Sequence, residues 1–304
     1  MTGIHLGRVA ALTLGVGAAC VAYGTFVESA AYRVRRVTVP VLDAGATPLR
    51  VLHLSDIHLM EFQRRRRAFL ASLAGLEPDL VVSTGDHLSS PDAVGALRDA
   101  FGRLLGLPGV FVFGSNDFHA PSLRNPVRYM WRSTADDADA ERDDMRPAEL
   151  KDTLASSGWV DVDDARTVLQ VRGQRLDIRG TGDAHESRDH YERVAGATEP
   201  GTVPLGVTHA PYSRVLDAMA RDGVRLVFAG HTHGGQVCVP LYGALTSNCD
   251  LPPARAKGLF RHETADGHAC WVHVSAGVGM SPYAPFRFAC PPEVTVLTLT
   301  AGPE

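Results

Sequence analysis

The stretch VFAGHTHGGQ (residues 227–236) ends an apolar run with two histidines set among three glycines. The run VRLVFA (224–229) is short and almost uninterrupted, which is typical of a strand that is buried on both faces of an α/β sheet. Glycines permit the tight backbone corner that would direct the imidazoles of His231 and His233 inward. Two histidines in such a corner indicate paired metal ligands, and such ligands need partners elsewhere in the chain.

Four further apolar runs end in polar corners of the same kind. They are LRVLHL (49–54) before SDIH, DLVVST (79–84) before GDH, GVFVF (109–113) before GSND, and VPLGVT (203–208) before HAP. Helix-like segments follow several of these corners, and the alternation predicts an α/β sheet that is covered on both faces. In such a sheet the carboxyl ends of the strands form the ligand-binding edge.

Seven side chains at these corners are candidate metal ligands. They are Asp56, His58, Asp86, Asn116, His209, His231 and His233. Each alone has an ordinary explanation, since a loop histidine is often solvated and an aspartate after a strand often caps a turn or helix. Together they exceed the needs of one metal, whereas two metal ions can share a carboxylate and a water. Oxygen and nitrogen donors without thiolates predict two divalent ions of manganese, iron or zinc.

The motifs resemble those of the calcineurin-like metallophosphoesterase superfamily. The resemblance rests on DIH (56–58), GD (85–86), GSND (114–117), THAP (208–211) and GHTHGGQ (230–236), and it extends over roughly residues 48–300. With the apolar N-terminus, it points to the membrane-associated bacterial branch of YkuE-like and YaeI-like enzymes. It implies an α/β fold, a four-layered αββα sandwich with a two-metal site at one edge. By the same resemblance, Asp56, His58 and His233 hold one metal, Asp86 bridges both, and Asn116, His209 and His231 hold the other.

The third corner departs from the family pattern of glycine, asparagine, histidine and an acid. This chain has Gly114, Ser115, Asn116 and Asp117. Without a gap, Ser115 replaces the ligand and Asn116 replaces the histidine that assists the leaving group. With a shift of one residue, Asn116 remains the ligand, which we favour because an amide oxygen binds a hard cation better than a serine hydroxyl.

The usual catalytic histidine is missing from its position under either alignment. We therefore expect Asp86 and Asn116 to act in catalysis, with His119 as the replacement and His87 and His185 as alternatives. Proton donors need specific placement, which the sequence alone does not give. Residues 120–150 are predicted to be an insertion at the rim, with a basic and aromatic first half and an acidic second half. Arg124 and Arg128 in its first half are candidate phosphate-binding residues.

The N-terminal stretch VAALTLGVGAACVAYGTFV (9–27) has 19 residues and no charge. At about 1.5 Å per residue, a helix of this length spans roughly the 30 Å hydrocarbon core of a bilayer. A cleaved signal peptide is the alternative. We expect an uncleaved single-pass anchor in the cell membrane over residues 1–30, a linker with a leading strand over 31–47, and the phosphoesterase domain over 48–304.

The side of the membrane stays open. Arginines after the anchor favour a cytoplasmic domain, whereas four cysteines besides Cys20 could pair in an exported one or be buried thiols. The net charge of −4 excludes nucleic acid as an expected partner, because phosphate-backbone binding needs a concentrated basic face. We expect a monomer.

These features predict a membrane-anchored phosphohydrolase with a dinuclear metal centre. It would cleave a phosphate ester, phosphodiester or pyrophosphate bond through a metal-bridging hydroxide, on a phosphorylated small molecule or a lipid- or envelope-linked substrate. The altered third corner leaves an alternative, a metal-binding scaffold at the membrane with impaired catalysis.

Overall fold

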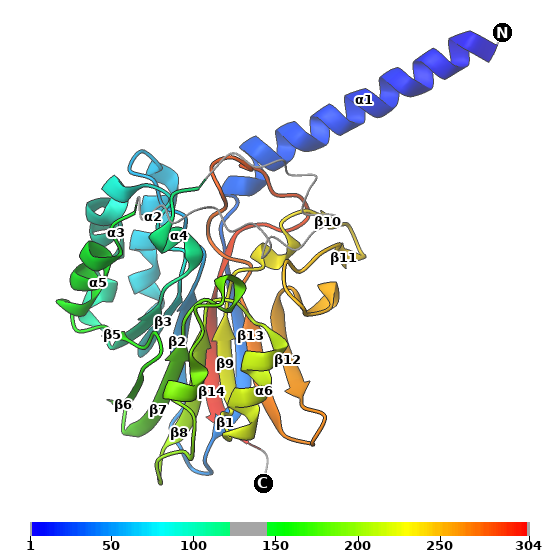
Figure 1. Cartoon of the computed structure of the whole chain (residues 1–304). Helices are drawn as coiled ribbons and strands as arrows, with labels where there is room; N and C mark the ends of the chain where they lie inside the picture. The colour runs from blue at the N-terminus through cyan, green and yellow to red at the C-terminus, as the bar shows by residue number, and fades with distance from the viewer. Residues whose placement is uncertain (1, 122–144, 303–304) are drawn as a thin grey trace.

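Two six-stranded sheets stacked face to face form the centre of the protein (Figure 1). The structure is a computed structural model that describes residues 2–121 and 145–302. The first sheet has the order β1 (Arg33–Leu42), β14 (Glu293–Ala301), β2 (Leu49–Leu54), β3 (Leu80–Thr84), β4 (Gly109–Val112) and β5 (Val160–Asp161). Strands β2 to β5 are mutually parallel, so their carboxyl ends share one edge of the sheet.

The second sheet repeats this plan with antiparallel strands at both of its edges. Its order is β12 (Gly258–Glu263), β13 (Ala269–Val274), β9 (Leu226–Ala229), β8 (Val203–Thr208), β7 (Gln174–Thr181) and β6 (Arg166–Val171). The four central strands are parallel, whereas β12 and β6 run against their neighbours. A short hairpin of β10 (Cys238–Val239) and β11 (Gly243–Ala244) stands apart from both sheets.

Apolar side chains from both sheets meet between them and form one continuous core. Val51, Val82 and Val110 of the first sheet belong to the same buried cluster as Leu205 and Phe228 of the second. The strands of both sheets are nearly continuous apolar runs because each central strand is buried on both faces.

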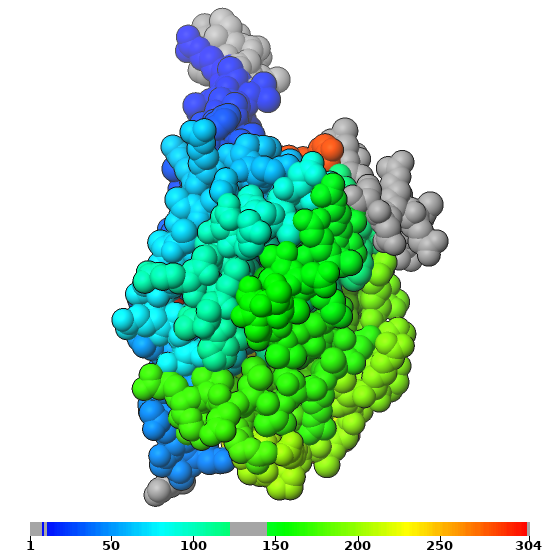
Figure 2. Space-filling view, turned by 90° about the vertical axis from the view of Figure 1, so that its left-hand side faces the viewer, coloured from blue at the N-terminus to red at the C-terminus, as the bar shows by residue number. Residues whose placement is uncertain are grey.

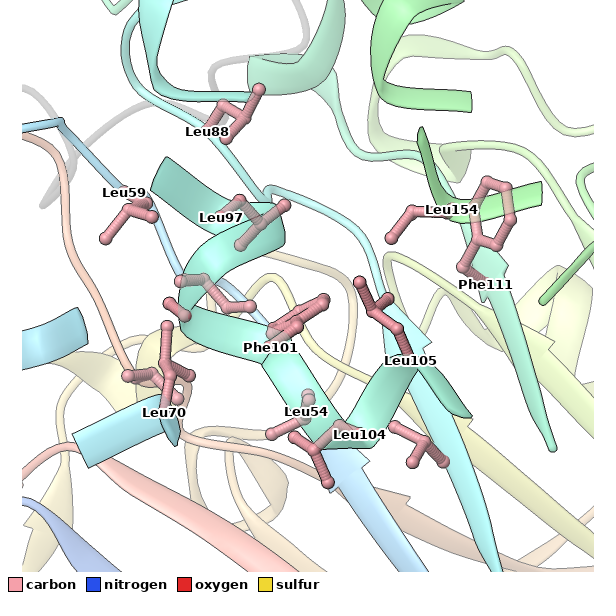
Figure 3. Close-up of a cluster of buried hydrophobic side chains, with 14 of the residues drawn as sticks. Leu54, Leu59, Leu70, Leu88, Leu97, Phe101, Leu104, Leu105, Phe111 and Leu154 are labelled. Carbon is pink, nitrogen blue, oxygen red and sulfur yellow. The ribbon is translucent and has the colours of Figure 1, made fainter. Parts of the chain in front are cut away.

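Helices cover the outer face of each sheet. On the first sheet they are α2 (Arg64–Ser72), α3 (Val94–Phe101) and α5 (Pro147–Ala155), and Figure 2 shows them closing this face of the molecule. Leu97 and Phe101 of α3 and Leu70 of α2 gather with Leu54 of β2 and Phe111 of β4 (Figure 3). Helix α6 (Ser213–Arg221) covers the second sheet with a strongly amphipathic face. The predicted four-layered αββα fold is confirmed.

The N-terminal helix α1 (Thr2–Phe26) projects away from the sandwich (Figure 1). Residues Ala11–Ala30 have the length and the apolar composition to cross a membrane, with a mean hydropathy of 1.4. Signal sequences share these properties. A short 3-10 helix, Glu28–Ala30, connects α1 to β1, which pairs in parallel with β14 from Arg33 onward.

The five cysteines are free thiols in this structure. Cys238, Cys270 and Cys290 are buried, and Cys249 is half-buried. The sequence left open whether these cysteines form disulfides or are buried thiols, and the structure shows thiols.

Candidate metal centre

The carboxyl ends of five strands bring the seven predicted metal ligands to one edge of the sandwich. Asp56 and His58 follow β2, Asp86 follows β3, Asn116 lies in α4 (Ser115–Phe118) after β4, His209 follows β8, and His231 and His233 follow β9. Both sheets thus contribute to a single site.

Four of these side chains form a compact group that could hold one metal ion. One ligand atom from each of Asp56, His58, Asp86 and His233 lies within 4.8 Å of the others. The Nε2 atom of His58 is 3.3 Å from Nε2 of His233 and 3.3 Å from Oδ2 of Asp86. The Nε2 atom of His233 is 3.6 Å from Oδ1 of Asp56. Two carboxylates and two imidazoles therefore converge on one small volume.

The other three predicted ligands gather around the same aspartate, Asp86. The amide Nδ2 of Asn116 donates to Oδ2 of Asp86 at 2.8 Å, and its backbone N–H donates to Oδ1 at 2.9 Å. The Nε2 atom of His209 is 3.7 Å from Oδ2 of Asp86. The rings of His209 and His231 lie 5.2 Å apart between centroids. Asp86 thus contacts members of both groups, as a residue bridging two metals must.

Hydrogen bonds to backbone carbonyls fix how three of the imidazoles present their nitrogen atoms. Nδ1 of His209 donates to the carbonyl of Thr84 at 2.6 Å, which leaves Nε2 buried with no hydrogen-bond partner among the described residues. Nε2 of His231 lies 3.0 Å from the carbonyl of Asn248, and Nδ1 of His233 lies 3.3 Å from that of Gly279. When one ring nitrogen donates in this way, the other offers a lone pair to a metal. These side chains therefore fit a divalent metal ion.

Five of the candidate ligands have a left-handed backbone conformation. The φ angles are 48° at Asp56, 45° at His58, 53° at Asp86, 68° at His231 and 49° at His233. Such angles are uncommon for residues other than glycine and cost about 1–3 kcal/mol each. The fold thus maintains a strained backbone where the ligands converge.

The three glycines of the stretch 227–236 are required for two different structural reasons. Gly234 and Gly235 have positive φ angles of 63° and 81°, as the sequence suggested. Gly230 instead provides close approach, because a Cβ atom there would collide with Oγ of Ser55 and lie 2.5 Å from Oδ2 of Asp56.

Burial and neighbouring charges shift the pKa values of the site. Burial, with Asp86 nearby, raises the pKa of Asp56 to about 6, whereas burial lowers the pKa values of His58 and His231 to about 4. Burial opposes ionisation of His209, but the carboxylates of Asp86, Asp183 and Asp56 together raise its pKa to about 10. Without metal, His209 therefore carries the positive charge that faces these carboxylates.

Asp117, in the altered third corner, is a structural residue. Its carboxylate accepts hydrogen bonds from the backbone N–H groups of His87 and Gly114 and lies 2.9 Å from Nδ1 of His87. Nε2 of His87 is 2.8 Å from Oγ of Ser83. All three side chains are fully buried, so His87 fixes this corner and does not face a substrate.

His119 lies beside the segment Asp183–Arg188. Its Nε2 atom is 3.1 Å from Nη2 of Arg188 and 3.6 Å from a carboxylate oxygen of Glu186. His185 of the same segment packs against His231, with ring centroids 4.4 Å apart. Both histidines therefore stay candidates for the missing catalytic group. Arg124 and Arg128 lie outside the described residues.

Arg287 is a residue of the site that no sequence motif identifies. This guanidinium is fully buried, donates to the carbonyls of Ala276 and Gly279 at 2.7 and 2.6 Å, and lies 3.3 Å from Nδ1 of His233. It fixes the loop against which His233 packs. The one sequence feature that could have indicated its role is that Arg287 directly follows an uncharged segment, residues 274–286.

The chain is similar in sequence to known phosphoesterases. The profile of the calcineurin-like phosphoesterase family matches residues 49–235. Phosphodiesterase YaeI of Escherichia coli (strain K12) is 26% identical over 260 residues, covering 84% of this chain and 83% of that protein. The uncharacterized metallophosphoesterase YkuE of Bacillus subtilis (strain 168) is 24% identical over 310 residues, covering 95% and 92%. A Bos taurus transmembrane protein with a metallophosphoesterase domain is 27% identical over 282 residues, covering 89% of this chain and 57% of the bovine protein.

Proposed function

The chain belongs to the calcineurin-like phosphoesterase family, and from this premise we propose that it is a membrane-attached phosphohydrolase with a dinuclear metal centre. The family resemblance predicted from the motifs is confirmed, and the chain is a metal-dependent phosphoesterase. We propose that it cleaves a phosphate ester, a phosphodiester or a pyrophosphate bond.

The position of Asp86 is the observation that carries the proposal. Its carboxylate lies between the group of Asp56, His58 and His233 and the group of Asn116, His209 and His231. The buried Nε2 of His209, which has no hydrogen-bond partner in the part of the chain that the structure describes, supports the same assignment. We propose these seven residues as the ligands of two divalent ions, manganese, iron or zinc.

Two such ions, when bound, would lower the pKa of a shared water and offset the negative charge of the phosphate. The chain itself contributes orientation. Asn116 holds both carboxylate oxygens of Asp86, and the carbonyls of Thr84 and Gly279 fix the rings of His209 and His233. Arg287 donates to the same Gly279 carbonyl and so fixes the position of the acceptor of His233.

Protonation of the leaving group falls to residues other than the usual histidine. His119 directly follows α4 and lies 3.1 Å from Nη2 of Arg188, which adds a positive charge next to it, whereas His185 packs against the candidate ligand His231. We propose His119 as the proton donor, with His185 as the alternative. If neither acts, the enzyme favours substrates with good leaving groups, such as pyrophosphates.

The proposed anchor supports a lipid- or envelope-linked substrate. We propose that residues 1–30 attach the chain to the membrane as a single helix, that 31–47 include the strand that joins the first sheet, and that 48–304 form the catalytic domain. The length and composition of α1 support this attachment, as does the name of the bovine relative. The proposed active unit is a monomer.

Turnover of bis-(p-nitrophenyl) phosphate by the detergent-solubilised full chain tests the proposal. We expect manganese-dependent turnover that Asp86→Ala abolishes. Asp99→Ala is the matched control, because Asp99 is an exposed carboxylate on α3. Turnover that persists unchanged in Asp86→Ala would overturn the assignment.

The second candidate is a metal-binding scaffold with impaired catalysis, which the altered corner at Ser115–Asn116 motivates. It predicts two bound metal ions without turnover of any aryl phosphate, aryl phosphodiester or pyrophosphate.

A further inference from the structure

Exposed apolar side chains concentrate on one hairpin beside the metal centre. Beyond α1 and Val27, the exposed large apolar residues among those described are Phe62, Val168, Val237, Val239, Leu241, Tyr242, Leu245 and Tyr283. Five of these eight belong to the hairpin 236–245, which contains β10 and β11. Leu241 and Tyr242 at its tip are 110% and 78% exposed. Groups of exposed apolar side chains, unlike single ones, mark sites that contact another protein or a membrane.

The hairpin also lacks charge. Residues 234–249 contain no aspartate, glutamate, lysine or arginine, and neither do residues 274–286, which carry Tyr283. An edge hairpin in water is normally protected by charged side chains. A surface of leucine, valine and tyrosine without charge instead matches the boundary between lipid headgroups and acyl chains.

One segment holds this hairpin next to the end of α1. Val237 forms a parallel bridge with Phe288, and the backbone N–H of Cys238 donates to the carbonyl of Phe288 at 2.8 Å. Phe288 in turn packs edge-on against Tyr23 of α1, with ring centroids 6.3 Å apart. The carboxylate of Glu28 accepts hydrogen bonds from the backbone N–H groups of residues 289 and 290. Figure 1 shows α1, β10 and β11 at the same end of the sandwich.

Positive charge borders this end of the molecule. Exposed Phe62 is followed by Arg64 and Arg65, which are exposed at the start of α2. Helix α2 lies beside the chain that leaves α1, because Phe69 stacks on Tyr32 with centroids 4.7 Å apart. Arginines next to apolar interfacial residues bind the anionic headgroups of phospholipids.

We propose that the hairpin Gln236–Leu245 inserts into the interface of the bilayer that α1 enters, and that the metal centre thereby opens onto lipid headgroups. This inference rests on the membrane attachment proposed above. It deepens the proposed function by making the substrate class a phosphate or pyrophosphate ester carried on a membrane lipid.

The hairpin is linked directly to the ligands. His233 precedes it by three residues, and Asn248, whose carbonyl binds His231, follows it by three. A hairpin held in the headgroup layer thus sets the distance between that layer and the metal ligands.

Depth-dependent quenching tests the insertion in the full chain. Tyr242→Trp, Leu14→Trp and Val168→Trp are each reconstituted into nanodiscs of phosphatidylcholine and phosphatidylglycerol with brominated acyl chains. The signal of the wild-type protein, which has three tryptophans, is subtracted. We expect quenching at Leu14→Trp and Tyr242→Trp but not at Val168→Trp, which lies on edge strand β6.

The three positions separate the two proposals. Quenching at Leu14→Trp without quenching at Tyr242→Trp overturns the hairpin insertion and leaves the membrane attachment standing. An unquenched Leu14→Trp overturns the attachment and the insertion that rests on it.

Turnover gives an independent readout. In Leu241→Asp/Tyr242→Asp, we expect at least a tenfold loss of turnover on a diacylglycerol pyrophosphate in nanodiscs. Turnover of bis-(p-nitrophenyl) phosphate should stay unchanged, and Val168→Asp should retain both activities. Equal lipid turnover in wild type and the double variant would contradict the proposal. A wild-type dimer in nanodiscs that the double variant dissociates would also overturn it, because a second copy would then cover the hairpin.

Discussion

As a proposed metal ligand, His209 should link metal binding to the release of a proton. Its pKa of about 10 in the metal-free protein exceeds the ordinary value of 6.5, because the carboxylates of Asp86, Asp183 and Asp56 outweigh the effect of burial. At pH 8 such a group holds a proton in about 99% of molecules, by the definition of a pKa. A cation bound at Nε2 must displace that proton, since only the neutral ring is a ligand.

The number of protons released follows from this protonated fraction of His209. Filling the site at pH 8 should release about one proton from His209, in addition to any proton lost by bound water. Between pH 7 and pH 9 this contribution makes the apparent metal affinity rise about tenfold per pH unit, or about 1.4 kcal/mol. Asp56, with its pKa raised to about 6, adds roughly half a proton at pH 6.

Isothermal titration of the metal-free full chain with manganese measures this release. Titrations at pH 8 in two buffers of different ionisation enthalpy give the number of protons. His209→Asn is the control, because an amide keeps a donor atom without titrating. We expect the wild type to release about one proton more than the variant. Equal release by both proteins would refute the assignment of the proton to His209.

Three further predictions follow from the packing around the site. The double variant Ser115→Asn/Asn116→His restores the family corner in the ungapped alignment. Because Asn116 already binds Asp86, we expect this variant to hold less metal than the wild type in elemental analysis. A gain in metal content and turnover would support the ungapped alignment instead. Gly230→Ala places a Cβ atom against Ser55. It should lower the unfolding free energy of the metal-free protein by about 1–3 kcal/mol in chemical denaturation. An unchanged denaturation midpoint would contradict the close approach of Gly230 to Ser55. Arg287→Met leaves several buried carbonyls without a hydrogen-bond donor and should lower the unfolding free energy by about 3–5 kcal/mol in the same assay. A decrease below about 1 kcal/mol would show that water replaces the guanidinium.

The sequence predicted the fold and the gathering of the candidate ligands at one edge because both depend on local patterns. Apolar runs such as 79–84 and 203–208 identify central parallel strands, and parallel strands place the residues that follow them at one edge. That rule alone brings Asp86 next to His209, although they are 123 positions apart in the chain. The paired sheets and their helical layers followed from the resemblance carried by the same corners.

Features that depend on long-range pairing could not be predicted. Strand β14, from the end of the chain, inserts between β1 and β2, and no local pattern specifies that neighbour. The left-handed backbone at the ligands opposes local propensity, so tertiary contacts must impose it. Arg287 becomes part of the site only because its loop folds back beneath His233. The role of Asp117 as the hub of a buried corner likewise required the positions of Gly114 and His87.

The central claim is that two metal ions bind on either side of Asp86. Elemental analysis of the full chain, purified after reconstitution with manganese, iron or zinc, tests it most directly, with Asp86→Ala as the comparison and Asp99→Ala as the control. We expect close to two equivalents of metal in the wild type and in Asp99→Ala, and a sharp fall in Asp86→Ala. Less than about half an equivalent in the wild type with all three metals would contradict it.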